Sequence, residues 1–275
     1  MKYLITGATG CLGEALVTRL IGEHEIVAVC RDEGKLIALR ERYPKLKIII
    51  GDVANKWVIK EAMQGVDGVF HLAAQKHVGL SEEFVHQTIT SNVTGSMNIL
   101  EESWITRPKF VLAVSTDKAS NPNGVYGATK HLMEKLMKQS EGINPETQYR
   151  VVRYGNVMGS TGSFVTKWKP LMEAGKEIIL TDPEATRFYW TVEEAVNLIF
   201  ECLEKSTDST PYIPKMKAAS MKVALEACQE VYGKSPVKII GLQVGENLHE
   251  TMDGIIFSNE VEQFTKEEFI QKFLC

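Results

Sequence analysis

Three glycines, spaced three residues apart, separate the first apolar run of the chain from its first helical pattern. They are Gly7, Gly10 and Gly13, which follow a predicted strand at 2–6 and open a predicted helix at 12–21. Glycine permits a tight turn and lets the backbone approach a pyrophosphate with no Cβ in the way. The helix N-terminus adds free N–H groups and a partial positive charge. An ordinary glycine-rich turn can have the same glycine spacing. The position of these glycines between a strand and a helix, however, predicts a dinucleotide-binding site.

The alternation of strand and helix continues to residue 154. Further strands are predicted at 25–30, 47–50, 68–72, 110–115 and 149–154. Helices are predicted between them at 33–42, 56–63, 82–103 and 125–139. Strands that read as continuous apolar runs and alternate with helices indicate a parallel sheet covered on both faces. The predicted fold class is therefore α/β, with a Rossmann-type doubly wound parallel sheet.

After Tyr154 the elements become shorter and turn residues more frequent. Helices are predicted near 192–203 and 220–231, and strands at 212–213 and 237–240. This change predicts a smaller α/β substrate-binding lobe interleaved with the end of the first domain. We assign residues 1–160 to the dinucleotide-binding domain, with 190–214 returning to it. Residues 161–189 and 215–275 are assigned to the smaller lobe.

The charge balance excludes several classes of protein. The 275 residues include 31 Lys+Arg and 35 Asp+Glu, so the formal net charge is −4. A mild negative charge with no basic block lacks the field that nucleic-acid binding needs. No apolar run approaches the ~18 residues of a membrane span, and glycines come too early for a secretion signal. We expect a cytoplasmic protein that binds neither nucleic acid nor membrane.

The five cysteines and six histidines are scattered along the chain. They include no Cys-x-x-Cys pair and no cluster with metal-ligand spacing, so we expect neither a disulfide framework nor a metal site.

The end of the second strand bears on the choice of cofactor. An NAD site usually places a carboxylate there for the ribose 2′-hydroxyl, whereas an arginine accommodates a 2′-phosphate. Here Cys30 holds the terminal position and Arg31 follows it, which favours NADP over NAD, although Asp32 remains an alternative ribose ligand. The predicted cofactor-binding residues are Gly7, Thr9, Gly10, Cys11, Leu12, Gly13, Arg31, Asp52, Val53, Leu72, Ala73, Ala74, Lys76, Tyr126 and Lys130.

A polar segment stands at the end of a buried strand, where open α/β sheets place their ligands. This segment is Ser115-Thr116-Asp117-Lys118, and Tyr126 and Lys130 follow on a predicted helix. Residues four apart share one helix face, so the tyrosine and the lysine can point into one cleft. A neighbouring ammonium favours the phenolate, which makes Tyr126 a candidate base. A surface Tyr–Lys pair is the alternative, but the glycine turn and the strand-end segment favour a catalytic role.

These residues resemble the extended short-chain dehydrogenase/reductases, and more closely the inverting UDP-N-acetylglucosamine 4,6-dehydratases of polysaccharide biosynthesis. The glycine turn and Tyr-x-x-x-Lys specify only the superfamily. Narrower motifs are 70–78 (FHLAAQKHV), 91–95 (SNVTG), 115–122 (STDKASNP), 153–160 (RYGNVMGS), 181–183 (TDP), 186–188 (TRF) and 245–250 (GENLHE). The resemblance covers residues 2–251.

The resemblance implies a complete mechanism. Tyr126, assisted by Lys130, takes the proton of the C4 hydroxyl while hydride passes to the nicotinamide. In such enzymes the lysine of Thr-Asp-Lys, here Lys118, removes the C5 proton, and the aspartate, here Asp117, protonates the departing C6 hydroxyl. Hydride then returns to C6. A lysine acts as a base only when its pKa is lowered, and a salt bridge between the neighbours is the alternative role.

Other positions are predicted to bind the substrate. Thr116 is expected near C4 of the sugar, with Ser115 as a less favoured partner, and Arg187 suits a diphosphate. Asn92, inside a predicted helix, is expected to have a buried polar role. The substrate-binding residues are Lys76, His77, Thr116, Asn156, Ser160, Ser163 and Arg187.

The chain also departs from the family pattern. Thr161 and Asn247 stand where relatives commonly have basic residues, which predicts weakened or altered contacts with the diphosphate. Retaining relatives have glutamate at the position of Lys118, which favours inversion at C5.

Two alternatives stay open. One is a nucleotide-sugar epimerase or reductase that uses Tyr126 and Lys130 without dehydration. The other is a regulator that binds NADP without catalysis. The resemblance also implies a homo-oligomer, because helices such as 82–103 and 125–139 commonly pair between subunits in this superfamily.

Overall fold

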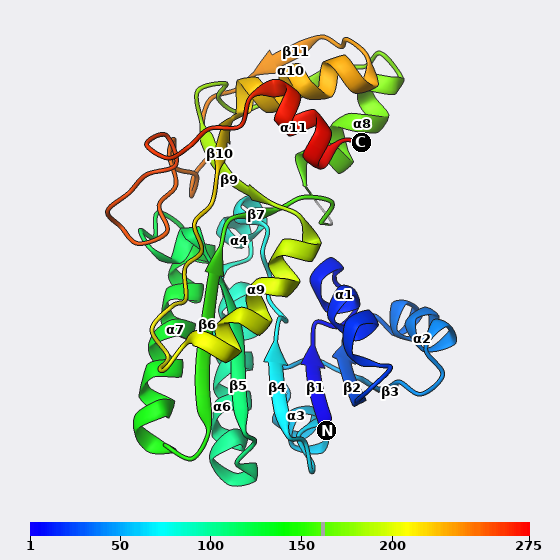
Figure 1. Ribbon diagram of the computed structural model, residues 1–275, viewed down its shortest axis with the longest axis vertical. Helices are drawn as coiled ribbons and strands as arrows, with labels where there is room; N and C mark the ends of the chain where they lie inside the picture. Colours follow the sequence, from blue (N-terminus) through cyan, green and yellow to red (C-terminus); the bar gives the residue numbers. More distant parts are fainter. Residues whose placement is uncertain (161–162) are drawn as a thin grey trace.

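A parallel six-stranded sheet organises the N-terminal half of the chain (Figure 1). The computed structural model describes residues 1–160 and 163–275. The strands are β1 (Lys2–Thr6), β2 (Glu25–Cys30), β3 (Lys47–Ile50), β4 (Gly68–His71), β5 (Phe110–Thr116) and β6 (Gln148–Tyr154). Their order across the sheet is β3-β2-β1-β4-β5-β6, with every neighbouring pair parallel. This order confirms the predicted Rossmann-type α/β class.

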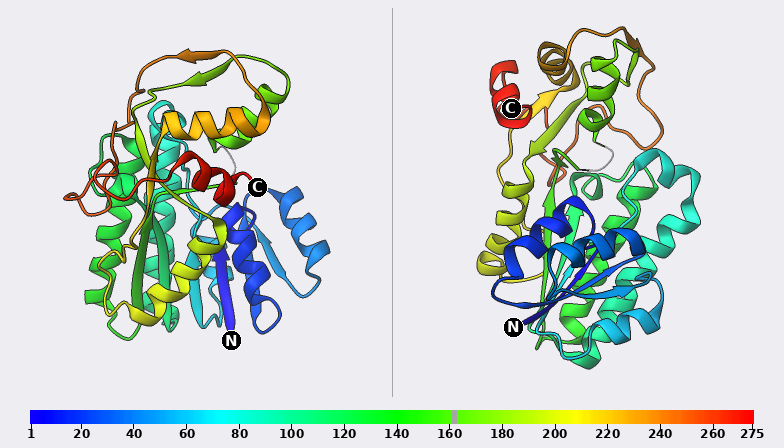
Figure 2. Two further views of the ribbon diagram at one scale, coloured as in Figure 1. Left: turned by 45° about the horizontal axis from the view of Figure 1, so that its top comes forward. Right: turned by 90° about the vertical axis from the view of Figure 1, so that its right-hand side faces the viewer.

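Helices cover both faces of this sheet, as Figure 2 shows in its right-hand view. One face carries α1 (Cys11–Leu20), α2 (Glu33–Arg42) and α9 (Val192–Lys205), and the other carries α3 (Lys56–Ala62), α6 (Gly95–Thr106) and α7 (Val125–Ile143). Successive side chains of a strand point to opposite faces. Ile5 therefore packs in the cluster with α1 and α9, whereas Leu4 packs in the cluster with α3, α6 and α7.

The strand order reverses beside β1, and this reversal opens a crevice at the carboxyl ends of the strands. The chain leaves β1 for β2 on one side and reaches β4 on the other. Thr6 and His71, the last residues of β1 and β4, lie opposite each other in the register. The loops that follow these strands carry the glycine turn and the Lys76–His77 segment.

Shorter elements lie beyond the carboxyl ends of the sheet (Figure 1). Their strands are β7 (Asn156–Val157), β9 (Thr186–Trp190) and β10 (Ala218–Ser220) in one sheet, and β8 (Ile178–Leu180) with β11 (Val237–Ile239) in another. Their helices are α8 (Phe164–Glu173), α10 (Met221–Tyr232) and α11 (Lys266–Phe273). Tyr189 packs edge-on against Phe269 in their core. The predicted boundaries of the two domains stay a prediction.

The helix predicted at 82–103 is instead four consecutive segments. These are α4 (Val78–Glu83), α5 (Val85–Ile89), a π-helical turn η1 (Thr90–Thr94) and α6. Phe84, with φ −112° and ψ 57°, separates the first two because its backbone is not helical. The strand predicted at 212–213 is only an isolated bridge between Tyr212 and Val152. Helices α8 and α11 had no counterpart in the sequence-based prediction.

None of the helices within the described residues has the length and apolarity needed to span a bilayer.

Candidate active site

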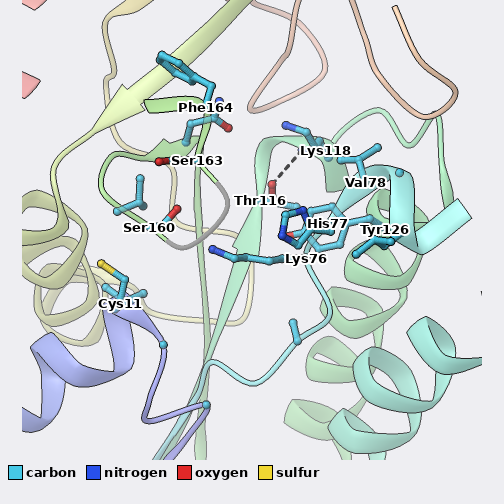
Figure 3. Close-up of a pocket in the computed structure, with 18 of the residues that line it drawn as sticks. Cys11, Lys76, His77, Val78, Thr116, Lys118, Tyr126, Ser160, Ser163 and Phe164 are labelled. Atoms are coloured by element: carbon cyan, nitrogen blue, oxygen red, sulfur yellow. Dashed lines mark hydrogen bonds between the residues drawn. The ribbon is translucent and has the colours of Figure 1, made fainter. Parts of the chain in front are cut away.

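A cavity of about 1110 Å³ opens at the carboxyl ends of the sheet strands and extends to α8 and β8. Every residue predicted for the site lines this cavity except Asp117. Figure 3 shows two facing walls: Cys11, Ser160, Ser163 and Phe164 lie on one, and the Lys76–Val78 loop with Thr116, Lys118 and Tyr126 lies on the other. The predicted residues, separate in sequence, therefore come together at one place.

The glycine turn is shaped by contacts that leave no space for a side chain. Gly7 has φ +69°, and a Cβ there would lie 2.9 Å from the backbone nitrogen of Ala73. A Cβ on Gly13 would collide with the carbonyl oxygen of Gly7. Gly10, at the N-cap of α1, provides no side-chain cap, so the first N–H groups of the helix are left for an anion. This cradle fits the pyrophosphate of a dinucleotide.

The part of the cavity beside the ends of β2 and β3 carries the residues predicted to select the cofactor. Arg31 Nη1 lies 3.4 Å from Asp52 Oδ2, and both side chains are exposed toward the cavity mouth. Thr9 Oγ1 lies 2.8 Å from Cys30 Sγ. Asp32, the alternative ribose ligand, does not line the cavity and instead caps α2 by accepting a hydrogen bond from Lys35 N. Arg31 is therefore the charged residue of this strand end that faces the cavity.

Asn92 connects the loop before Lys76 to the helix that carries Tyr126. Its Oδ1 accepts from Gln75 N at 2.7 Å, and its Nδ2 donates to Gln75 O and to Thr129 Oγ1. Asn92 is 1% exposed and lies in the π-turn η1. The amide joins the loop before Lys76 to the helix of Tyr126, which is the buried polar role predicted for it.

Tyr126 and Lys130 occupy one face of α7 and both line the cavity. Burial lowers the pKa of Lys130 to about 8, against the opposing effect of the Glu134 carboxylate. Burial also raises the pKa of Tyr126 to about 12, although the Lys118 ammonium acts in the opposite direction. The phenol is therefore protonated near neutral pH, and additional positive charge is needed to make it a base.

Lys118 lies between two buried carboxylates. Its Nζ is 3.2 Å from Asp117 Oδ1 and 3.1 Å from Glu250 Oε1. Burial alone would lower the pKa of Lys118, but these two carboxylates outweigh it and the pKa is raised. The two carboxylates therefore hold the amine as an ammonium, in the salt bridge that the sequence analysis gave as the alternative role.

Asp117 lies behind the cavity wall rather than in it. It is 1% exposed, and its Oδ1 accepts hydrogen bonds from Thr116 Oγ1 at 2.8 Å and from Lys118 Nζ at 3.2 Å. Among the residues the structure describes, Oδ2 has no hydrogen-bond partner. Burial raises the pKa of Asp117, against the effect of Lys118, and Glu250 raises it further. Asp117 does not line the cavity, whereas its hydrogen-bond partners Thr116 and Lys118 do.

A second buried ion pair lies beneath the site, and the sequence analysis missed it. Glu134, one turn after Lys130, accepts from Arg153 Nε at 3.0 Å and from Nη2 at 2.5 Å. It also accepts from Ser115 Oγ at 2.5 Å, so this hydroxyl faces the ion pair rather than the sugar. Arg153 donates as well to the carbonyl oxygen of Met252. The helical spacing from Lys130 to Glu134 was the available signal.

The predicted substrate residues are not equally free to bind. Arg187 is 7% exposed and donates to the carbonyl oxygens of Thr186 and Leu248, so only part of its guanidinium faces the cavity. Ser163 caps α8. Burial, Lys167 and Lys76 lower the pKa of His77. Lys167 of α8 also lines the cavity and was not predicted.

The two departures from the family pattern have different outcomes. Asn247 Nδ2 donates to Glu250 Oε2 at 3.1 Å, so this side chain supports the buried carboxylate instead of facing a diphosphate. Thr161 lies outside the described residues.

Comparison with known proteins agrees with this arrangement. A family model described as "Polysaccharide biosynthesis protein" matches residues 3–272. A UDP-glucose 4-epimerase of Rickettsia canadensis (strain McKiel) is 37% identical over 261 residues, which cover 90% of this chain and 76% of the epimerase. A UDP-N-acetylglucosamine 4,6-dehydratase (inverting) of Campylobacter jejuni is 37% identical over 259 residues, which cover 91% and 77%.

A solved structure supports the same relationship. The X-ray structure of Pen from Bacillus thuringiensis matches with a TM-score of 0.87 at 30% identity, covering 91% of this chain and 80% of that one. The resemblance predicted from the motifs is thus confirmed, and the chain belongs to the polysaccharide biosynthesis protein family, with the fold of the extended short-chain dehydrogenase/reductases.

Proposed function

We propose that the protein is an NADP-dependent UDP-N-acetylglucosamine 4,6-dehydratase that inverts C5 and acts in the cytoplasm. The observation that carries the proposal is the presence of Thr116, Lys118, Tyr126 and Lys130 around the same cavity as the glycine turn. A carbonyl reductase needs the tyrosine and lysine of α7 but has no use for a second acid–base group beside them. Lys118 is that second group.

The first step is oxidation at C4. A nicotinamide cofactor held by the glycine turn from Gly7 to Gly13 would supply the hydride acceptor for C4 and the hydride donor for C6. Tyr126 takes the proton of the C4 hydroxyl, and Lys130 favours the phenolate with its ammonium. We assign Thr116, which lines the cavity together with Tyr126, to orient the same hydroxyl.

The second step is elimination of water. The C4 ketone acidifies the C5 proton, and the neutral amine of Lys118 removes it. Asp117 supplies the proton that converts the C6 hydroxyl into water. Because Asp117 lies behind Thr116, we assign the transfer to the Thr116 hydroxyl, which contacts Asp117 Oδ1 at 2.8 Å and lines the cavity. The C6–O bond breaks as the C5 proton leaves.

NADP is the cofactor we favour over NAD. Arg31 lines the cavity at the end of β2, where a 2′-phosphate is expected, and Asp32 is engaged in capping α2. The guanidinium pairs with Asp52 only at 3.4 Å and in an exposed position, so this contact is easily exchanged for a phosphate.

Incubation of the purified protein with UDP-N-acetylglucosamine tests the function. We expect a product lighter by one water by mass spectrometry, with a proton NMR spectrum of an inverted 4-keto-6-deoxy sugar. Retained C5 configuration would contradict the inversion alone. An unchanged mass with an altered sugar would contradict dehydration.

The second candidate is nucleotide-sugar epimerisation. A relative named UDP-glucose 4-epimerase has the same 37% identity as the relative named as an inverting dehydratase. The ammonium form of Lys118 in the resting protein also agrees with a group that does not act as a base. Parallel assays with UDP-glucose and UDP-N-acetylglucosamine separate the two candidates, since only dehydration releases water.

We also propose that the protein forms a homo-oligomer. Large apolar side chains remain exposed along α4 and α5, namely Leu80, Phe84, Val85 and Ile89. Light scattering of the purified protein, with Phe84→Ser as a comparison, tests whether this helical face pairs with a second copy.

A further inference from the structure

Glu250 lies close to the proposed acid–base pair without lining the cavity. It is 1% exposed, and its Oε1 is 3.1 Å from Lys118 Nζ, which also contacts Asp117 Oδ1 at 3.2 Å. Its other oxygen accepts from Asn247 Nδ2 at 3.1 Å, and its backbone N donates to Ser258 Oγ at 2.9 Å. Such a carboxylate is fixed in position by its own neighbours and does not need the substrate to order it.

The charges around Glu250 balance. Arg187 Nε lies 3.9 Å from Glu250 Oε1, so two buried carboxylates face two buried cations. The titratable groups that face this cluster are Asp117, Lys118, Arg187, and the phenols of Tyr126 and Tyr189. Burial alone would raise the pKa of Glu250, but Lys118 and Arg187 hold it below its usual value. Glu250 therefore stays ionised while the pair beside it exchanges protons.

Transfer of one proton within the pair leaves the charge of the cluster unchanged. In the resting state Lys118 is an ammonium beside the Asp117 carboxylate, and after transfer it is an amine beside a carboxylic acid. The second state is the one that dehydration requires, with a neutral base and a protonated acid. The contact of 3.2 Å between Lys118 Nζ and Asp117 Oδ1 is the path for this proton.

We propose that Glu250 is a positioning residue, which holds the Lys118 amine against Asp117 and keeps one proton shared between the two. This inference rests on the proposed dehydration. Lys118 gains the proton from C5, and Asp117 loses one through Thr116 to the departing hydroxyl, so the two transfers restore the resting ammonium–carboxylate pair. When hydride returns to C6, C5 takes up one proton, and the proton that Tyr126 removed from the C4 hydroxyl balances it.

Removal of the Glu250 charge tests this role. The negative charge of Glu250 raises the pKa of Lys118 and the pKa of Asp117. Glu250→Gln is therefore expected to lower both pKa values, by about one to three units. Both limbs of the kcat pH profile should move to lower pH, with kcat reduced and KM little changed. Glu250→Asp keeps the charge but withdraws it by one methylene, so a smaller shift is expected. Glu262→Gln, an exposed carboxylate on the same C-terminal segment, is the matched control and should leave the profile unchanged.

A second readout does not depend on activity. In protein labelled with ¹³C at the aspartate carboxyls, and assigned with Asp117→Asn, the Asp117 signal should titrate at lower pH in Glu250→Gln than in the unmodified protein. An unmoved titration overturns the positioning role even if water is lost from the substrate. A moved titration without water loss from any UDP-sugar contradicts the proposed function and supports the coupling. Failure of both Glu250 variants to fold would assign Glu250 to stability alone, which also overturns the inference.

Discussion

The two walls of the cavity are built on different physical principles. The cofactor wall is made by backbone: the cradle at Gly7 is formed by N–H groups and by the absence of Cβ atoms. The acid–base wall depends on buried charges: Lys118 lines the cavity, and the carboxylates of Glu134 and Glu250 lie behind the lining. A site formed by the backbone can be identified in a short stretch of sequence. A site formed by paired charges depends on tertiary contacts and exists only in the folded protein.

The largest effect on activity is expected when Lys118, the proposed base of the acid–base wall, is removed. Lys118→Ala should abolish exchange of solvent deuterium into C5 and reduce turnover by about 10²–10⁴-fold, because the base is lost. Cofactor binding, measured by fluorescence titration, should be retained because the other wall is intact. Normal exchange at C5 would remove Lys118 as the base, and lost cofactor binding would show that the two walls are not independent.

The ion pair beneath the site should contribute strongly to stability. Glu134→Gln leaves Arg153 buried without its carboxylate, and we expect a loss of about 3–5 kcal/mol in the free energy of unfolding. Urea denaturation measures this loss. Glu146→Gln is the matched control, since Glu146 pairs with Arg107 in an exposed position and should contribute about 1 kcal/mol or less. Equal losses in both variants would contradict the distinction between buried and exposed charge.

Burial of the Lys130 ammonium is expected to reduce the free energy of unfolding of the protein. Its pKa falls from 10.5 to about 8 on folding, so the unfolded chain binds more protons between these values and stability rises with pH across that window. Below pH 8 the full penalty applies, on the order of 3 kcal/mol. Lys130→Met should therefore be more stable than the unmodified protein at pH 7, by urea denaturation, and this advantage should disappear near pH 10.5. A destabilised variant at pH 7 would show that the amine is not disfavoured by burial.

The smallest effect is expected at the exposed end of the cofactor wall. Arg31→Ala should weaken NADP binding by about 1.5 kcal/mol, roughly tenfold, because a charged hydrogen bond to the 2′-phosphate is lost. NAD binding should change less. Isothermal titration with both cofactors measures the difference, and equal losses would contradict the preference for NADP.

The sequence predicted the central sheet well because apolar strands and amphipathic helices are local patterns. It predicted the helix at 82–103 as continuous because nothing local indicates the π-turn in which Asn92 reaches Gln75. Lys118 was recognised from its motif, but the carboxylate that holds it could not be located. Glu250 is 132 residues away in sequence, and the charge of a side chain does not reveal its buried partner.

The amide of Asn92 also limits how the protein admits a substrate. Because one side chain bridges the Gln75 backbone and the Thr129 hydroxyl, the loop and the helix on that side of the cavity form a single stiff unit. The opposite wall, to which α8 contributes Phe164, is not part of this unit. The Asn92 amide therefore fixes the spacing between the loop that leads to Lys76 and the helix that carries Tyr126, independently of the opposite wall.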